Sequence, residues 1–229
     1  MFASVFKIFR YIVIKPYGQH LESRHGLRVI LIALRDVAQT MKSSNTNNIL
    51  HCDIKPSNII LHENHGYLID WDTAKRRDFP EAKELSATIA FCPLAVWLFF
   101  FSPVNYMYSI LQDSFNLKAP VFQVSDSLTT QKSHEYTIDD DVESLFYTLM
   151  DILCDGRLIW TKALTVEDVD VHKRLMIYEF EKQLNYAPEE FHSILSEFHF
   201  LFFDSVKRSR KQIDIDTVIE FFDHKIGIM

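Results

Sequence analysis

The sequence predicts an α+β fold that is mainly helical and carries a small β hairpin. Two short apolar runs, 59–61 and 67–69, flank a glycine-containing turn at 63–66, a pattern typical of two antiparallel strands. Residues 137–149 begin with acidic side chains and continue with apolar ones at helical spacing, as expected of a capped, buried helix. Amphipathic helical spacing then recurs in three stretches: 166–184, 188–206 and 213–228.

Composition limits the class of protein. The chain has 229 residues, of which 48% are hydrophobic and 14% aromatic, enough for one sizeable core. A net charge of −7 argues against a nucleic-acid partner, and we interpret the basic cluster 207–211 as a solvated loop. The three cysteines are widely spaced, with no C-x-x-C pair and no secretory segment ahead of them. We therefore expect a reducing compartment, the cytoplasm or the nucleus.

A polar segment before the first apolar run carries the residue types of a phosphoryl-transfer site. It contains His51, Asp53 and Lys55, and Asn58 lies five residues after the aspartate. Asp70 follows the predicted hairpin, which would bring it back beside this segment. Carboxylate and amide oxygens suit Mg²⁺, and a lysine suits a phosphate group. A chance polar turn is the alternative, but the spacing favours a resemblance to the catalytic loop of protein kinases.

Two further patterns narrow this resemblance. Residues 140–149 read Asp-Asp-x-Glu-Ser-x-Phe-Tyr-x-Leu, and residues 68–72 read Leu-Ile-Asp-Trp-Asp. Both resemble the fungal-type protein kinase family. In kinases the helix at this place has a first-turn aspartate that accepts hydrogen bonds from the catalytic loop, and Asp141 takes that position. The resemblance implies that Asp141 and His51 brace the loop; an ordinary acidic helix N-terminus is the alternative for Asp141.

The resemblance also implies an activity and its cofactors. The implied fold is protein-kinase-like, mostly its helical large lobe, and the implied reaction moves phosphate from ATP to Ser or Thr of a protein substrate. Asp53 would accept the proton of the substrate hydroxyl, and Lys55 would contact the γ-phosphate of ATP. Asn58 and Asp70 would bind Mg²⁺. The expected partners are therefore ATP, Mg²⁺ and a protein.

The start of the chain resembles only the end of a kinase small lobe. We interpret residues 1–18 as a remnant small-lobe strand and hinge, and residues 19–229 as the large lobe of one domain, with a long helix at 27–41. Lys15 resembles the ATP-binding lysine, but too few residues separate it from Asp53 for the helix, strands and hinge that belong between them. The alternative to an active kinase is a catalytically impaired pseudokinase that acts as a binding module, because no Gly-rich loop precedes the hinge.

Residues 85–112 contain no charged side chain. We interpret the region near 94–120 as an unusual apolar insertion. Three alternatives stay open for it: a buried or partner-covered insertion, a translated non-coding stretch, and a membrane span. Pro93 and Pro103 interrupt the roughly 20 apolar residues that a span needs, so a membrane is not an expected partner.

The N-terminal segment predicts self-association. Its apolar residues would lack a partner sheet in the absence of a small lobe, and such a patch promotes association; they are Phe2, Val5, Phe6, Ile8 and Phe9. Light scattering of the purified chain should give a mass above the 26.9 kDa of one copy. The double substitution Phe6→Ser and Phe9→Ser should shift the population toward monomer. A monodisperse monomer of the unsubstituted chain at high concentration would contradict this expectation.

Overall fold

The computed structural model describes residues 17–77, 88, 90–93, 135–158, 169, 171–173, 180–202 and 213–229. Within these ranges it combines several helices with two small antiparallel sheets, so the predicted α+β class is confirmed. The helices are α1 (Leu27–Thr46), α4 (Ile138–Leu153), α6 (Phe180–Leu184), α7 (His192–His199) and α8 (Ile215–Gly227). Short 3₁₀ turns are η1 (Pro56–Asn58), η2 (Trp71–Thr73) and η4 (Glu189–Phe191).

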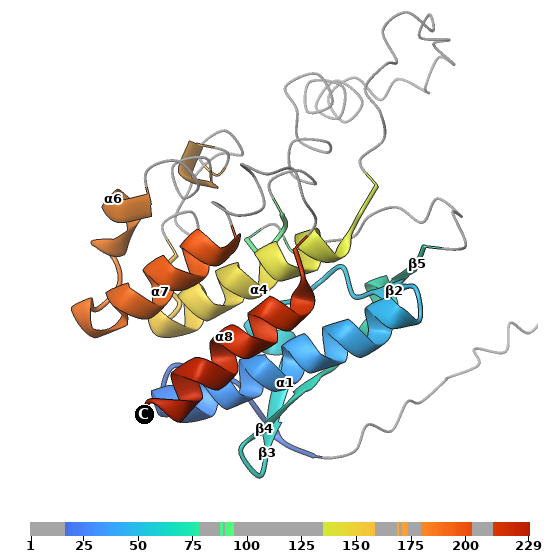
Figure 1. Cartoon of the computed structure of the whole chain (residues 1–229), viewed down its shortest axis with the longest axis horizontal. Helices are drawn as coiled ribbons and strands as arrows, with labels where there is room; N and C mark the ends of the chain where they lie inside the picture. Colours follow the sequence, from blue (N-terminus) through green and yellow to red (C-terminus); the bar gives the residue numbers. More distant parts are fainter. Residues whose placement is uncertain are drawn as a thin grey trace, which may run out of the picture.

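Helix α1 starts at the predicted residue but runs five residues further than predicted, to Thr46. Its last turns are polar and satisfy their own hydrogen bonds: Ser43 Oγ donates to the Gln39 carbonyl at 3.0 Å, and Thr46 Oγ1 to the Lys42 carbonyl at 2.9 Å. The predicted range 27–41 therefore matches the part of the helix that carries buried apolar residues, whereas the helix itself continues to Thr46. Helix α8 lies alongside α1, and the chain ends near the start of α1 (Figure 1).

The predicted hairpin is present, with a shorter turn than expected. Strands β3 (Ile59–His62) and β4 (His65–Leu68) pair antiparallel, with His62 opposite His65. Glu63 and Asn64 have φ values of 52° and 65°, the left-handed pair that a two-residue turn requires. The predicted four-residue turn was therefore wrong for residues 65 and 66, which belong to β4.

Three strands of two residues each complete the sheets. Strand β1 (Gln19–His20) pairs with β3, and β2 (Ile49–Leu50) pairs with β5 (Lys75–Arg76). Residues 1–16 of the predicted remnant small-lobe strand and hinge (1–18), which include the apolar residues of the N-terminus, lie outside the described residues. So does the apolar segment near 94–120, and only residues 88 and 90–93 of the Thr88 region are described. In the described parts of the chain, no helix is both long and apolar enough to cross a bilayer.

Helix α4 crosses the middle of the molecule. Thr137 precedes it, and the Thr137 N–H donates to the Asp140 carboxylate at 2.7 Å, so the acidic start caps the helix as predicted. Nearly all of its side chains are buried, polar ones included. The helix contacts α1 and α7, and Figure 1 shows α4 beside α7. An element buried on all sides gives a rigid base for whatever it holds.

The C-terminal helices fill the remaining core with aromatic rings. Of the predicted helix 166–184, the described residues are helical, and the predicted helix 188–206 begins as η4 and α7. The Phe198 ring centroid lies 5.6 Å from that of Phe146 and 5.4 Å from that of Phe222. Phe200 is 64% exposed, because it follows Phe198 by two positions and so points away from the core.

Gly66 allows strand β4 to touch helix α1. A Cβ atom at this position would lie 2.4 Å from the carbonyl oxygen of Ala33, far inside van der Waals contact. We predict that Gly66→Ala lowers the free energy of unfolding by about 1–3 kcal/mol, the usual cost of overpacking. Gly227→Ala is the matched control, since nothing lies within 4 Å of a Cβ there, and it should leave the urea midpoint close to wild type. Equal midpoints for both variants would contradict the contact.

Candidate active site

The predicted catalytic loop joins strand β2 to strand β3. Cys52 has a φ of 67°, a left-handed conformation that is rare for a residue other than glycine. Lys55 is extended, and the turn η1 follows it, with the Asn58 N–H donating to the Lys55 carbonyl at 3.0 Å. This path folds the loop back on itself, so that side chains five residues apart in sequence can meet.

Asp141 holds this loop from helix α4. Its Oδ2 accepts the backbone N–H of His51 and its Oδ1 that of Cys52, both at 2.9 Å. Tyr136 adds its hydroxyl to Oδ1 at 3.0 Å, and the carboxyl group is 1% exposed. Burial raises the pKa of Asp141 to about 6, and these three hydrogen bonds oppose the rise. The strained backbone at Cys52 is thus tied directly to the central helix.

His51 links the loop to the segment after the hairpin. Its Nε2 lies 3.0 Å from the Ile69 carbonyl, which can only accept, while its Nδ1 lies 3.3 Å from the Asp53 N–H, which can only donate. The ring is therefore neutral, with its proton on Nε2. Burial lowers the pKa of His51, in agreement with that form. The ring also meets Trp71 edge-on, with centroids 4.7 Å apart.

Asp53 lies at the centre of the polar network. Its Oδ2 accepts Lys55 Nζ at 2.6 Å and Asn58 Nδ2 at 3.1 Å. Its Oδ1 accepts both the N–H and the hydroxyl of Thr88, at 3.1 and 2.8 Å. Burial raises the pKa of Asp53, but the hydrogen bonds from Lys55 and Thr88 outweigh burial and lower it below its usual range. Asp53 is therefore a carboxylate at neutral pH.

Thr88 is a site residue that the sequence did not identify as one. Its hydroxyl accepts Lys55 Nζ at 2.6 Å while donating to Asp53, so it joins the two predicted catalytic side chains. Its carbonyl accepts the N–H groups of Phe91 and Cys92, both at 2.9 Å, which closes a turn. Its position in the uncharged stretch 85–112 gave no indication of this role.

The two predicted Mg²⁺ ligands come from neighbouring backbone segments. The Ile69 N–H donates to the Asn58 carbonyl at 2.9 Å. Asp70 directly follows Ile69, so this backbone hydrogen bond brings the segment that carries Asp70 next to Asn58. Asp70 is exposed and has a φ of 64°. Asn58 Nδ2 donates to the Asp53 carbonyl at 2.9 Å, so Oδ1 is the atom that could bind a metal. This pair of oxygen donors suits Mg²⁺, which typically takes one or two carboxylates and completes its shell with phosphates and water.

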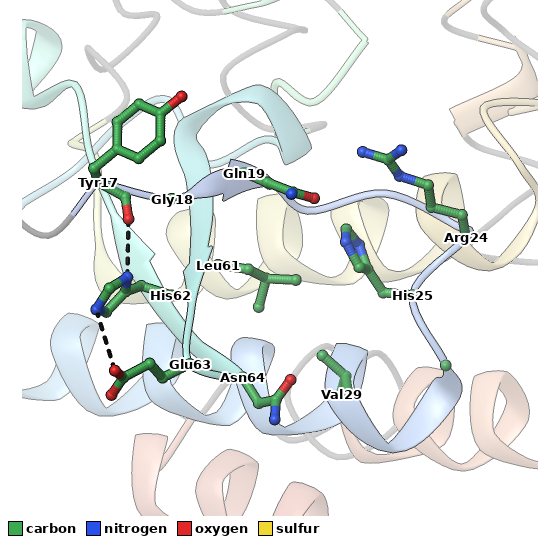
Figure 2. A pocket seen from close by; sticks show the side chains of 11 residues that line it. Tyr17, Gly18, Gln19, Arg24, His25, Val29, Leu61, His62, Glu63 and Asn64 are labelled. Carbon is green, nitrogen blue, oxygen red and sulfur yellow. Dashed lines mark hydrogen bonds and ion pairs between the residues drawn. The ribbon is translucent and has the colours of Figure 1, made fainter.

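Among the described residues, Asn58 and Asp70 are not part of a larger cluster of metal-binding side chains. Across the residues that the structure describes, no three His, Cys, Asp or Glu side chains are grouped to hold an ion. A cavity of about 580 Å³ lies elsewhere, between Tyr17–Gln19, the start of α1 and the β3–β4 turn (Figure 2). None of the predicted catalytic or metal-binding side chains lines this cavity.

Comparisons with known proteins find similarity to protein kinases. A sequence model of the family described as fungal protein kinase matches residues 4–153, which include the catalytic loop and all of α4. The cell cycle serine/threonine-protein kinase hsk1 of Schizosaccharomyces pombe is 35% identical over 74 residues. That match covers 29% of this chain and 15% of the length of hsk1, so the chain is similar to only a small part of that protein.

The contacts of Asp141 predict a large effect on stability. Asp141→Ala leaves the buried N–H groups of His51 and Cys52 without their acceptor, which should lower the free energy of unfolding by about 1–3 kcal/mol. Asp151→Ala on the same helix is the control, because no side-chain hydrogen bond to Asp151 is found among the described residues and burial alone raises its pKa to about 6. Urea denaturation compares the two. A midpoint unchanged by Asp141→Ala would show that the loop does not depend on it.

Proposed function

This chain belongs to the fungal protein kinase family, and on that basis we propose that it transfers the γ-phosphoryl group of ATP to Ser or Thr of a protein. We further propose that its described helices correspond to the large lobe of a protein kinase. The observation that carries the proposal is the network in which Lys55, Asn58 and Thr88 all donate to the Asp53 carboxylate. A protein catalyses phosphoryl transfer mainly by positioning the reacting groups and by stabilising their charge. This network would position a base, Asp53, beside a positive charge, that of Lys55.

In this proposal Asp53 accepts the proton of the substrate hydroxyl. A base must be ionised and within hydrogen-bond reach of the proton it takes. The lowered pKa of Asp53 meets the first condition. The second is supported by Thr88, because a hydroxyl group already lies 2.8 Å from Asp53 Oδ1, at the kind of distance a substrate Ser or Thr would need.

Lys55 brings positive charge next to the base. Its ammonium group lies 2.6 Å from both Asp53 Oδ2 and Thr88 Oγ1. A lysine is a compact point charge on a flexible stem, so it can turn from these oxygens to a phosphate group while staying close to Asp53. This is the support for a contact between Lys55 and the γ-phosphate.

Protein kinases generally use ATP with a divalent metal, which neutralises charge on the phosphates. We propose that Asn58 Oδ1 and the Asp70 carboxylate hold Mg²⁺. Support comes from the amide orientation, because Asn58 Nδ2 is fixed by two hydrogen bonds to Asp53 and its oxygen faces the other way. The exposed Asp70 can reach a bound metal without giving up a hydrogen bond that the described residues provide.

Transfer from radiolabelled Mg·ATP to dephosphorylated casein tests the proposal. Asp53→Asn should reduce transfer by about 10² to 10⁴-fold, the usual contribution of a general base. Asp223→Asn, an exposed aspartate on α8, should leave it unchanged. Removing Mg²⁺ with EDTA should abolish transfer.

In protein kinases a Gly-rich loop of the small lobe covers the phosphates of ATP. The chain should therefore be assayed both alone and fused, ahead of Ile12, to the small lobe of another family member. Transfer that depends on Asp53 in either form supports the enzyme. A folded fusion that binds Mg·ATP and transfers nothing would contradict it, and would favour a pseudokinase that acts as a binding module.

A further inference from the structure

Lys173 is a lysine with no exposed surface. Its ammonium group donates to the carbonyl oxygen of Cys92 and lies 4.6 Å from the centroid of the Tyr147 ring. Taking an ammonium group out of water costs several kcal/mol unless good partners replace the water. A carbonyl oxygen and an aromatic face are such partners. The positions of these two partners in the fold suggest a role for the buried ammonium group of Lys173.

The first partner leads to the active site. Cys92 and Phe91 donate their N–H groups to the Thr88 carbonyl, and Thr88 in turn donates its N–H and hydroxyl to Asp53. We call Thr88 and residues 90–93 the Thr88 turn. Lys173 holds the far end of this turn, and Asp53 holds the near end. No other described residue joins the Cys92 carbonyl by a hydrogen bond that the structure gives.

The second partner leads to the central helix. Tyr147 is fully buried in α4, and its hydroxyl donates to Glu143 Oε1 at 2.5 Å. Burial lowers the pKa of Lys173 to about 8, and the nearby Glu143 carboxylate opposes this shift. Lys173 is thus fixed by α4, the same helix whose Asp141 fixes the catalytic loop.

We propose that Lys173 is a positioning residue of the phosphoryl-transfer site, which fixes the Thr88 turn through the Cys92 carbonyl and so presents Thr88 to Asp53. This inference rests on the proposed function. The simpler alternative is that Lys173 only fills the core. The two differ in what an apolar side chain of similar length would do, because a methionine fills the space and cannot hold the carbonyl.

Hydrogen–deuterium exchange of a peptide that covers residues 88–93 tests the inference without any need for activity. Lys173→Met should speed exchange of this peptide by about 10-fold or more, while the denaturant midpoint stays at or above that of the wild type, since replacing a buried charge by an apolar group is often neutral or stabilising. Lys225→Met is the matched control. Lys225 is also buried, next to Phe221 and paired with Glu197, but it lies outside the network that leads to Asp53.

A kinetic measurement separates positioning from packing. In the casein assay Lys173→Met should lower kcat by about 10-fold and leave the KM for ATP within about twofold, because Lys173 contacts none of the residues proposed to hold Mg·ATP. Lys225→Met should change neither constant. If the unsubstituted sequence transfers no phosphate, either alone or in the small-lobe fusion, the proposed function is wrong, and the exchange experiment still decides whether Lys173 fixes the Thr88 turn.

Unchanged exchange at 88–93 in Lys173→Met would overturn the inference. Should that variant not fold, Lys173→Gln, whose side chain is too short to replace the ammonium group, is expected to give the same local rise in exchange. If neither variant folds, Lys173 is a structural residue and the inference is wrong.

Discussion

The carboxyl group of Asp141 is the contact on which the rest of the site depends. It fixes two successive backbone N–H groups, those of His51 and Cys52, and the second belongs to a residue in the left-handed region. A residue that is not glycine adopts this conformation only where its surroundings compensate the strain. Because α4 is buried nearly throughout, Asp141 cannot shift without disturbing the core. The orientation of the Asp53 side chain on the catalytic loop is therefore set by the packing of α4, and not only by the neighbours of Asp53.

Helix α4 holds the other side of the site as well. Asp141 accepts hydrogen bonds from the catalytic loop. Six residues later in the same helix, Tyr147 packs against Lys173, whose ammonium group contacts the Thr88 turn. The catalytic loop and the Thr88 turn, which meet at Asp53, are therefore both positioned by helix α4. This arrangement resembles the logic of other precise sites, in which side chains that do the chemistry are oriented by neighbours locked in the core.

Sequence patterns could locate much of this arrangement, and the reasons for success and failure are physical. The spacing of Asp53 and Asn58 is informative because a tight loop fixes both ends, and the acidic start of α4 is informative because a cap needs those residue types. The turn at Glu63 and Asn64 was misjudged because backbone angles, and not the glycine two residues later, determine its length. Thr88 and Lys173 gave almost no signal, since a single threonine in an apolar stretch and a single lysine in an amphipathic one owe their importance to contacts across the fold.

The Asp53 carboxylate has a further consequence for the order of events in a turnover. A carboxylate offers about four lone-pair positions, and four donors already occupy them: Lys55, Asn58 and two groups of Thr88. Under the proposed function, a hydroxyl group from a protein substrate would therefore meet a base with no vacant acceptor position. Lys55 is the donor that a phosphate could attract away, because it is the only cation among the four. A kinase built in this way would admit the nucleotide first, and the protein substrate would gain its place on Asp53 only when the nucleotide had drawn Lys55 aside.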